Sequence, residues 1–226
     1  MLDIFKKVPL FSEFDEGEIH AIITLATTHN IHKNNVIVQE GDDGNSMFIL
    51  LQGSVKISFY APDGREVILS LLETGDFFGE MSLLDKQPRS ATVTTLEASK
   101  VAQIRRSDFE RLLLKNPALS LKLLAEVVSR LRRTSILLER VSTMDVPHRL
   151  YSYLQDYCGR FGKETPQGIK IKLPTHQLIA DQLSTSRETI SRAVSALKQE
   201  NIITAATGRE VYVDIDAIED LLFAIQ

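Results

Sequence analysis

The sequence predicts an α+β protein in which a strand-rich first half is followed by a long helix and a mainly helical second half. Three observations lead to this prediction. Short β-branched runs alternate with Gly, Asp and Asn turns, a stretch without Gly or Pro follows Asn116-Pro117, and two well-capped short helices precede a final hairpin. We therefore divide the chain into residues 1–116, 117–144 and 145–226.

Composition places the chain among ordinary soluble globular proteins, because 43% of its 226 residues are apolar and 25% are charged. The longest apolar runs, 47–51 and 67–72, are far shorter than the roughly 18 residues that indicate a membrane span, and the N-terminus has no signal-peptide pattern. The single cysteine, Cys158, cannot form an internal disulfide, which fits a reducing compartment. We expect a cytoplasmic protein without a membrane partner.

The first part contains short β-branched or apolar runs that predict strands at residues 36–38, 47–51, 55–60, 67–72, 92–94 and 101–104. Turn residues separate these runs. Ala61-Pro62-Asp63-Gly64 is typical of a hairpin, since Pro sets φ and Gly accepts a positive φ. Short strands at this spacing predict a β-sandwich or a barrel-like roll.

The middle part predicts one helix from residue 117 to about residue 142, with Asn116 as its N-cap and Pro117 as its first residue. A seam with 4-3-4-3 spacing, typical of a coiled coil, consists of Leu124, Val128, Leu131, Ser135 and Leu138. A second copy of the chain is the simplest partner for this seam, so helix 117–142 predicts a homodimer. The alternative is that the helix packs back on its own β-domain.

The last part begins at Asp145, which can cap a helix over residues 146–161. A polar loop at 159–168 and an alternating strand at 169–173 follow. Two helices are predicted at about 175–183 and 186–200, then a hairpin over 202–213 that turns at Thr207-Gly208, and an acidic amphipathic helix over 216–225.

An anion-binding candidate lies at the turn Gly75-Asp76-Phe77-Phe78-Gly79-Glu80-Met81-Ser82-Leu83-Leu84, which Arg89-Ser90-Ala91 soon follows. Gly79 lets the backbone approach a ligand closely, Arg89 can bind phosphate bidentately, and Ser90 adds a hydroxyl donor. Glu80 accepts hydrogen bonds and therefore suits a sugar hydroxyl. The alternative is a Glu80–Arg89 ion pair that only steadies the turn.

Residues 173–194 predict a helix-turn-helix. Thr175 caps its first helix and Ser186 its second, while apolar residues point inward. The first exposed turns of the second helix present Arg187, Glu188, Ser191 and Arg192, and such positions face base edges in the major groove. Lys170 and Lys172 on the preceding strand, and Lys198 and Arg209, could contact phosphate. The alternative is that these charges are ordinary solvated side chains.

Together these motifs resemble the Crp/Fnr family of bacterial transcription regulators, and the likeness covers nearly the whole chain. Gly-Asp-Phe-Phe-Gly-Glu-Met-Ser-Leu-Leu followed by Arg-Ser-Ala is similar to the family's cyclic-nucleotide phosphate-binding segment. The resemblance implies an N-terminal cyclic-nucleotide-binding β-roll, a long dimerisation helix and a C-terminal winged helix-turn-helix. It implies that Glu80 binds the ribose 2′-hydroxyl, that Arg89 and Ser90 bind the cyclic phosphate, and that Gly79, Glu80 and Met81 line the site.

The same resemblance indicates the ligand's base and the DNA site. Thr134 and Ser135 match an adjacent Thr-Ser pair that contacts adenine across the dimer, so cyclic AMP is the favoured effector; a polar register residue is the alternative reading of Ser135. Arg-Glu-Thr-Ile-Ser-Arg at 187–192 implies TGTGA-like half-sites. Two such units should meet half-sites roughly 34–36 Å apart in a palindrome of double-stranded DNA, and RNA polymerase is an expected partner.

Other functions are less consistent with the sequence. One cysteine cannot hold an iron–sulfur cluster, and His20, His29 and His32 lie in no recognisable haem context, so we expect neither group. No constellation of nucleophile and acid–base residues indicates an enzyme. Two alternatives stay open. One is the same DNA-binding regulator responding to cyclic di-GMP or to no ligand, and the other is a cyclic-nucleotide module that regulates a partner protein.

The net charge of −4 would at face value count against a nucleic-acid partner. From Asp145 onward, however, nine Lys/Arg stand against eleven Asp/Glu, and four of these acids lie at 214–220. This balance predicts modest, salt-sensitive non-specific affinity and does not prevent a few placed arginines from reading bases.

Overall fold

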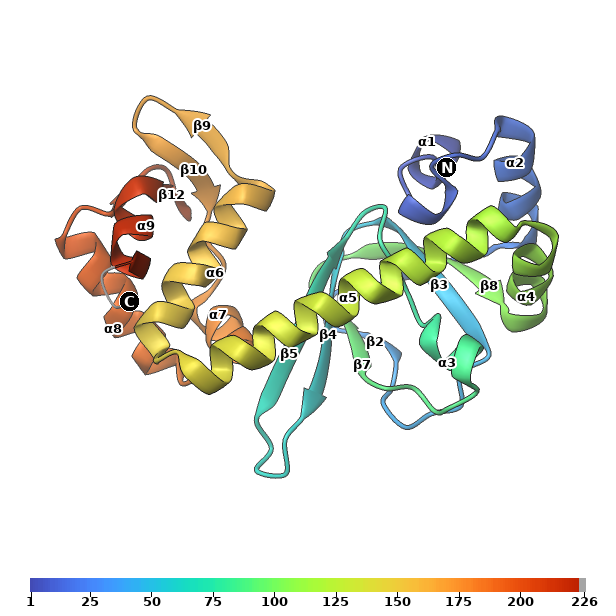
Figure 1. Ribbon diagram of the computed structural model, residues 1–226, viewed down its shortest axis with the longest axis horizontal. Coiled ribbons are helices and arrows are strands. Elements are labelled where there is room, and N and C mark those ends of the chain that lie inside the picture. The colour runs from blue at the N-terminus through green and yellow to red at the C-terminus, as the bar shows by residue number, and fades with distance from the viewer. Residues whose placement is uncertain (224–226) are drawn as a thin grey trace. The chain divides into compact units, whose positions relative to one another are not determined.

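A computed structural model describes residues 1–223 of the chain, which forms two compact units, Met1–Thr134 and Ser135–Gln226 (Figure 1). The division falls inside the long helix α5, Pro117–Thr143. Each unit has its own apolar core and is described separately. Within residues 1–223, no helix is both long enough and apolar enough to cross a bilayer.

Within residues 1–134 the strands form two antiparallel four-stranded sheets. The first has the order β1-β8-β3-β6, with bounds β1 Thr27–Ile31, β8 Ser99–Arg105, β3 Ser46–Gln52 and β6 Phe77–Phe78. The second has the order β2-β7-β4-β5, with bounds β2 Val36–Val38, β7 Thr92–Thr95, β4 Ser54–Tyr60 and β5 Glu66–Glu73. All six predicted runs are strands. The pattern missed β1, whose sequence Thr-Thr-His-Asn-Ile is mainly polar, and β6, which has two residues.

Strand β3 is buried on both faces, and its alternating side chains join two different apolar clusters. Phe48 and Leu50 lie in a cluster with residues of the second sheet, such as Val55 and Val93, so the two sheets pack face to face. Met47 and Ile49 point into a second cluster on the other face of the first sheet. A strand with two apolar faces reads as a continuous apolar run, which explains the pattern Met-Phe-Ile-Leu-Leu.

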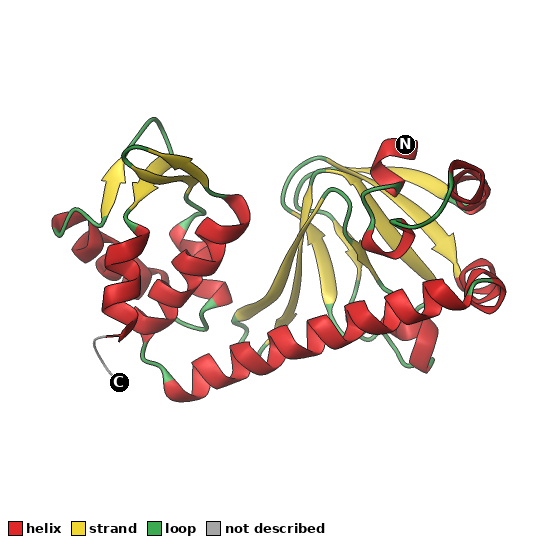
Figure 2. Cartoon of the chain, turned by 45° about the horizontal axis from the view of Figure 1, so that its top comes forward, coloured by secondary structure: helices red, strands yellow, loops and turns green. Residues whose placement is uncertain are grey.

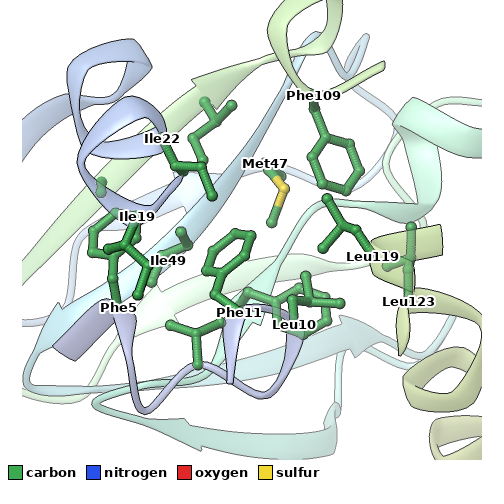
Figure 3. Packing of buried hydrophobic residues seen from close by; sticks show 14 of the residues in the cluster. Phe5, Leu10, Phe11, Ile19, Ile22, Met47, Ile49, Phe109, Leu119 and Leu123 are labelled. Carbon is green, nitrogen blue, oxygen red and sulfur yellow. The ribbon is translucent and has the colours of Figure 1, made fainter. Parts of the chain in front are cut away.

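Short helices cover the outer face of the first sheet, and Figure 3 shows their side chains meeting those of the strand. The elements are α1 Leu2–Phe5, a 3₁₀ turn Pro9–Phe11, α2 Glu16–Leu25 and α4 Arg106–Lys115. Phe5, Phe11, Ile19 and Phe109 are fully buried there. The sequence patterns had assigned no element to residues 1–26, and these segments are structured because they close the outer core.

Helix α5 begins and ends close to the predicted bounds and is continuous (Figures 1 and 2). The Oδ1 atom of Asn116 accepts a hydrogen bond from the Leu119 amide at 3.2 Å, so Asn116 caps the helix. Leu119 and Leu123 are buried against the β-domain, which makes the packing-back alternative correct for this short N-terminal face. The predicted seam remains exposed on the single chain, with 59% exposure at Leu124 and 64% at Leu131.

The second unit is a small α+β domain. Its elements are α6 Val146–Phe161, β9 Lys163–Thr165, β10 Gly168–Lys172, α7 His176–Gln182, α8 Arg187–Gln199, β11 Ile203–Ala205, β12 Glu210–Val213 and α9 Ile215–Phe223. The strand order is β11-β12-β10-β9, and all three pairings are antiparallel. Ile179, Ile190, Val194 and Val213 lie among the buried side chains of its core.

One prediction for this unit needs correction, and another extends beyond the described residues. Residues 159–168 are not one polar loop, because α6 continues to Phe161 and residues 163–165 form strand β9, which pairs with β10. The polar sequence Lys-Glu-Thr is compatible with an edge strand that has only one paired side. The last helix begins at Ile215, and residues 224 and 225 of its predicted range lie outside the described residues.

Candidate functional site

The turn after β6 is shaped by Gly79, which has a φ of 82°. A Cβ atom at this position would lie 2.6 Å from Nη1 of Arg89 and 3.2 Å from the Ser46 carbonyl oxygen. Only glycine accepts both the left-handed backbone and the close approach of Arg89. The turn leads directly into the short helix α3, Met81–Asp85, with Glu80 at its N-cap position.

Glu80 is 1% exposed, and its two carboxylate oxygens have different surroundings. Oε1 accepts a hydrogen bond from Nη1 of Arg130 at 2.9 Å, whereas Oε2 is buried and has no hydrogen-bond partner in residues 1–223. Burial raises the pKa of Glu80 above its usual range, and the Arg130 guanidinium only partly opposes this effect. The site therefore holds a buried acceptor that lacks a donor.

Arg130 was missed by the sequence reasoning. It lies on α5, where Nη2 also donates to the Phe77 carbonyl oxygen at 2.7 Å and the guanidinium lies 4.6 Å from the Phe77 ring centroid. The Glu80–Arg89 ion pair considered from the sequence is replaced by this Glu80–Arg130 pair. The only local signal was that Arg130 precedes Thr134 by one helical turn.

Arg89 is 6% exposed and donates from Nη1 to the Gly79 carbonyl oxygen at 2.8 Å and from Nη2 to the Ser46 carbonyl oxygen at 2.7 Å. Its Nε atom is buried without a hydrogen-bond partner among the described residues. Burial lowers the pKa of Arg89, and the nearby Glu80 carboxylate opposes this. Since the guanidinium remains charged at neutral pH, the structure holds a buried cation with a donor still available.

Ser90 and Met81 form the exposed edge of the same site. Ser90 is exposed, and its hydroxyl donates a weak hydrogen bond to the Met81 sulfur at 3.7 Å. Met81 itself is 48% exposed, although it is apolar. The predicted residues Gly79, Glu80, Met81, Arg89 and Ser90 are thus brought together in one place. The set offers a cation, a hydroxyl donor and an unpartnered carboxylate oxygen, which suits an anion that also carries a hydroxyl group.

Thr134 and Ser135 are both exposed on α5, one turn beyond Arg130. The Thr134 hydroxyl donates to the Arg130 carbonyl oxygen at 3.0 Å. Such a bond to the preceding turn leaves the hydroxyl oxygen able to accept. Their part in ligand binding stays a prediction.

The helix-turn-helix consists of α7 and α8, and both predicted caps are formed. Thr175 accepts from the Leu178 amide at 3.2 Å, and Ser186 accepts from the Thr189 amide at 3.1 Å. These contacts give Thr175 and Ser186 a structural role at the helix starts, where each also lies exposed. Their contact with DNA stays a prediction.

The first turns of α8 present the predicted base-reading side chains. Arg187, Glu188 and Arg192 are exposed, Ser191 is half-buried, and Ile190 fixes the opposite face of the helix in the core. This division follows the helical period of the apolar residues. The face of α8 that carries Arg187, Glu188 and Arg192 is therefore exposed, as the sequence pattern predicted.

The turn between α7 and α8 has a strained backbone. Ser184 has a φ of 52°, a left-handed conformation that is uncommon for a residue other than glycine or asparagine. Nη1 of Arg149 on α6 donates to the Leu183 carbonyl oxygen at 2.6 Å, and the Thr185 amide donates to the Ala180 carbonyl oxygen at 3.0 Å. These bonds hold the turn and so set the direction in which α8 leaves it.

The charges around this motif are unequal. Lys172 is exposed, but the ammonium group of Lys170 lies 2.8 Å from Oε2 of Glu210 on the adjacent strand β12, so its charge is partly neutralised. Burial, together with the positive charges of Lys198 and Arg187, lowers the pKa of His176. The positive charges of Lys198 and Arg187 therefore both act on His176, the first residue of α7.

Each of the two units contains a segment that matches a known protein family. Residues 28–116 match the family of cyclic nucleotide-binding domains, and residues 148–221 match the Crp-like helix-turn-helix domain. The CRP-like cAMP-activated global transcriptional regulator of Mycobacterium tuberculosis is 30% identical over 199 residues, covering 86% of this chain and 88% of the relative. The cAMP-activated global transcriptional regulator CRP of Escherichia coli O6:H1 is 32% identical over 179 residues, covering 78% and 85%.

Solved structures show the same fold. The catabolite activator protein of Thermus thermophilus has a TM-score of 0.56 and 26% identity, covering 96% of this chain and 100% of that one. CooA from Carboxydothermus hydrogenoformans has a TM-score of 0.78 at 21% identity, covering 89% and 90%. The two family matches and the sequence relatives, on a fold that solved structures share, establish the identity: the chain belongs to the Crp/Fnr family of transcription regulators.

Proposed function

We propose that the chain is a homodimeric, cyclic AMP-responsive regulator that binds a palindromic DNA site with TGTGA-like half-sites and acts on RNA polymerase. The observation that carries this proposal is the buried turn in which, among residues 1–223, Oε2 of Glu80 lacks a donor while Nε of Arg89 lacks an acceptor. A ligand with a ribose hydroxyl and a phosphate would supply both partners.

Two hydroxyl groups on α5 favour cyclic AMP over other cyclic nucleotides as the proposed effector. Thr134 and Ser135 are adjacent exposed hydroxyls one turn beyond Arg130, which pairs with Glu80. Hydroxyls can accept from an amino group such as that of adenine. The relatives from Mycobacterium tuberculosis and Escherichia coli are named as cAMP-activated, which supports the same effector here.

The apolar seam on α5 supports the proposal of a homodimer. Leu124, Leu131 and Leu138 are between 59% and 67% exposed on the single chain, an unusual exposure for leucines in one continuous row. Leu121, at 69% exposure, extends this row by one heptad position towards the N-terminus. Pairing with a second α5 would bury the row in a coiled coil. A ligand beside the seam would then change how the two helices meet.

A calorimetric titration tests the ligand. Cyclic AMP is titrated into the wild-type chain, into Arg89→Leu and into Arg65→Leu, where Arg65 is an exposed arginine on the hairpin of the same unit. We expect binding by the wild type and Arg65→Leu, and none by Arg89→Leu. Wild-type protein that binds DNA tightly but shows no heat with cyclic AMP would refute the effector, and a parallel titration with cyclic di-GMP would identify that alternative.

A DNA-binding assay tests the other half of the proposal. On a TGTGA palindrome, Arg187→Ala should weaken binding by about 1–3 kcal/mol and relax specificity at one base pair. Arg160→Ala serves as control, because Arg160 is exposed on α6 and stacks on Phe161 rather than lying on α8. An unchanged base preference in Arg187→Ala would remove this residue from the base-reading role. Complete absence of DNA binding by the wild type would instead favour a module that regulates a partner protein.

Sedimentation velocity tests the dimer directly. Leu131→Lys places a charge in the middle of the exposed row and should convert the dimer into monomer. Leu114→Lys is the matched control, since Leu114 is 85% exposed at the end of α4 and lies outside α5. A wild-type monomer at micromolar concentration would refute the homodimer.

A further inference from the structure

We propose that Arg106, which lies outside the sequence motifs, positions the two halves of the nucleotide site relative to each other by tying both to the loop at residues 41–45. Arg106 is the first residue of α4, directly after strand β8. This inference rests on the proposed function, because it concerns the same site, but it adds a residue and a loop that none of the motifs includes.

The Arg106 guanidinium holds the first half, which is the turn at Gly79–Glu80 with the helix α3 that follows it. Nη2 donates to the Ser82 carbonyl oxygen at 2.9 Å, and Nη1 approaches the Leu83 carbonyl oxygen at 3.5 Å. Helix α3 has only five residues, so it has little stability of its own and its last carbonyls lack intrahelical donors. Arg106 supplies those donors and fixes the helix.

The same guanidinium holds the loop. Nη2 also donates to the Gly44 carbonyl oxygen at 2.5 Å, and the Arg106 amide donates to the Asn45 carbonyl oxygen at 2.9 Å. One residue therefore bonds both to the loop and to α3 through a planar, rigid group. Its Nε atom is buried without a hydrogen-bond partner among the described residues, so this part of the half-buried side chain is enclosed.

The loop in turn holds the second half of the site, which is Arg89. The Gly41 amide donates to the Arg89 carbonyl oxygen at 2.9 Å, and the Arg89 amide donates to the Asp42 carbonyl oxygen at 2.8 Å. Gly44 lies between the two halves. A Cβ atom there would lie 2.4 Å from Cβ of Ser82 and 2.9 Å from Nε of Arg89. The loop thus contacts α3 and Arg89 at one point.

These contacts make the separation of Glu80 and Arg89 depend on Arg106. The ligand proposed above needs its hydroxyl at Glu80 and its phosphate at Arg89 simultaneously, and binding falls when the two are misplaced. Without Arg106, α3 and the loop each lose a charged hydrogen-bond donor, and either can move relative to the other. Arg106 itself is not a ligand contact in this proposal; it is a positioning residue.

Calorimetry with cyclic AMP distinguishes positioning from a merely structural role. Arg106→Gln should bind cyclic AMP about tenfold more weakly or worse, Arg106→Lys should fall between it and the wild type, and the neighbouring exposed Arg105→Gln should match the wild type. Adenosine, which lacks the phosphate, should lose less affinity than cyclic AMP in Arg106→Gln. Equal affinities in Arg106→Gln and Arg105→Gln, with the protein folded, would overturn the inference.

Hydrogen–deuterium exchange tests the same link without ligand, so that the inference can fail separately from the proposed function. In Arg106→Gln, amides at both 41–45 and 79–85 should exchange faster than in Arg105→Gln, while those of β8 remain protected. Gly44→Ala should also weaken cyclic AMP binding. Adding Ser82→Gly to Gly44→Ala should partly restore binding, because it removes the Ser82 Cβ atom that the added methyl group would meet. Unchanged exchange in both segments would overturn the positioning role, whereas a wild type that binds no cyclic AMP would refute only the proposed function.

Discussion

Replacement of Arg130 by Gln should destabilise the ligand-free N-terminal unit, because it leaves the buried Glu80 carboxylate without its cation. The two side chains are 27% and 2% exposed, and the Nη1–Oε1 distance is 2.9 Å. With charge centres about 4 Å apart and an effective dielectric constant near 20, their attraction is about 4 kcal/mol. Loss of one partner from a fully buried pair costs about 3–5 kcal/mol. Since Arg130 is partly exposed, water reaches the vacated position, and we expect a loss of about 2–3 kcal/mol at pH 7.

This loss should depend on pH, with a sign set by Glu80. Burial already raises its pKa in the folded state, and removal of Arg130 removes the strongest opposing influence, so the pKa rises further. A carboxyl whose folded pKa exceeds its unfolded value costs stability at every pH above the unfolded pKa, because burial penalises the charged form. That cost diminishes as the pH falls through the folded pKa and disappears below the unfolded one. The deficit of Arg130→Gln should therefore be smaller at pH 5 than at pH 7.

The assay is urea unfolding followed by far-UV circular dichroism, since the chain contains no Trp for fluorescence. Arg132→Gln is the matched control, because Arg132 is exposed on the same helix. The double variant with Glu80→Gln should regain part of the loss, since it removes the unpaired buried carboxylate, while the buried Arg89 guanidinium then loses a nearby anion. The reasoning is refuted if Arg130→Gln is as stable as Arg132→Gln at pH 7, or if its deficit persists unchanged at pH 5 and in the double variant.

Three further predictions concern the second unit. Ser184→Gly should raise the free energy of unfolding by about 1 kcal/mol, because glycine adopts a left-handed backbone without strain. Asn201→Gly, at φ 60°, should change the free energy of unfolding less, because Asn tolerates this region. Urea titration measures both variants, and equal effects would contradict the strain argument. Thr175→Ala should cost about 1 kcal/mol by removing the cap of α7, and an unchanged midpoint would contradict it. Burial raises the pKa of Cys158 to about 11, so iodoacetamide at pH 8 should alkylate the native thiol at least about a hundredfold more slowly than the urea-unfolded one, and similar rates would contradict burial.

Much of the second unit was predictable because its signals act over short distances. Helix caps bond three residues ahead, so Asp145, Thr175 and Ser186 could each be recognised from their neighbours, and each accepts the expected amide hydrogen bond. Asn116, at the start of α5 in the first unit, was recognised in the same way. The exposed face of α8 followed from the helical period in the same way. Strand β9 escaped because its polar residues carry no alternating pattern and it forms only by pairing with β10.

In the N-terminal site, likewise, the residues close in sequence were predictable and the distant partners were not. Gly79, Glu80, Arg89 and Ser90 lie within a short segment, and their chemistry indicated an anion site with a sugar partner. The partner of Glu80 could not be read in this way, since Arg130 is 50 residues away and joins it only when α5 lies against the β-domain. Arg106 is likewise distant from both segments it bonds.

By itself, then, the sequence determined which residue types stand at the caps, turns, apolar faces and ligand motif, because those preferences arise from local backbone and side-chain chemistry. Only the tertiary structure decided that Arg130 pairs with Glu80, that Arg106 connects residues 41–45 to α3, and which polar atoms of residues 1–223 are buried without partners. The physical reason is that hydrogen-bond partners and desolvation depend on packing between segments far apart in the chain, on which local propensity has no influence.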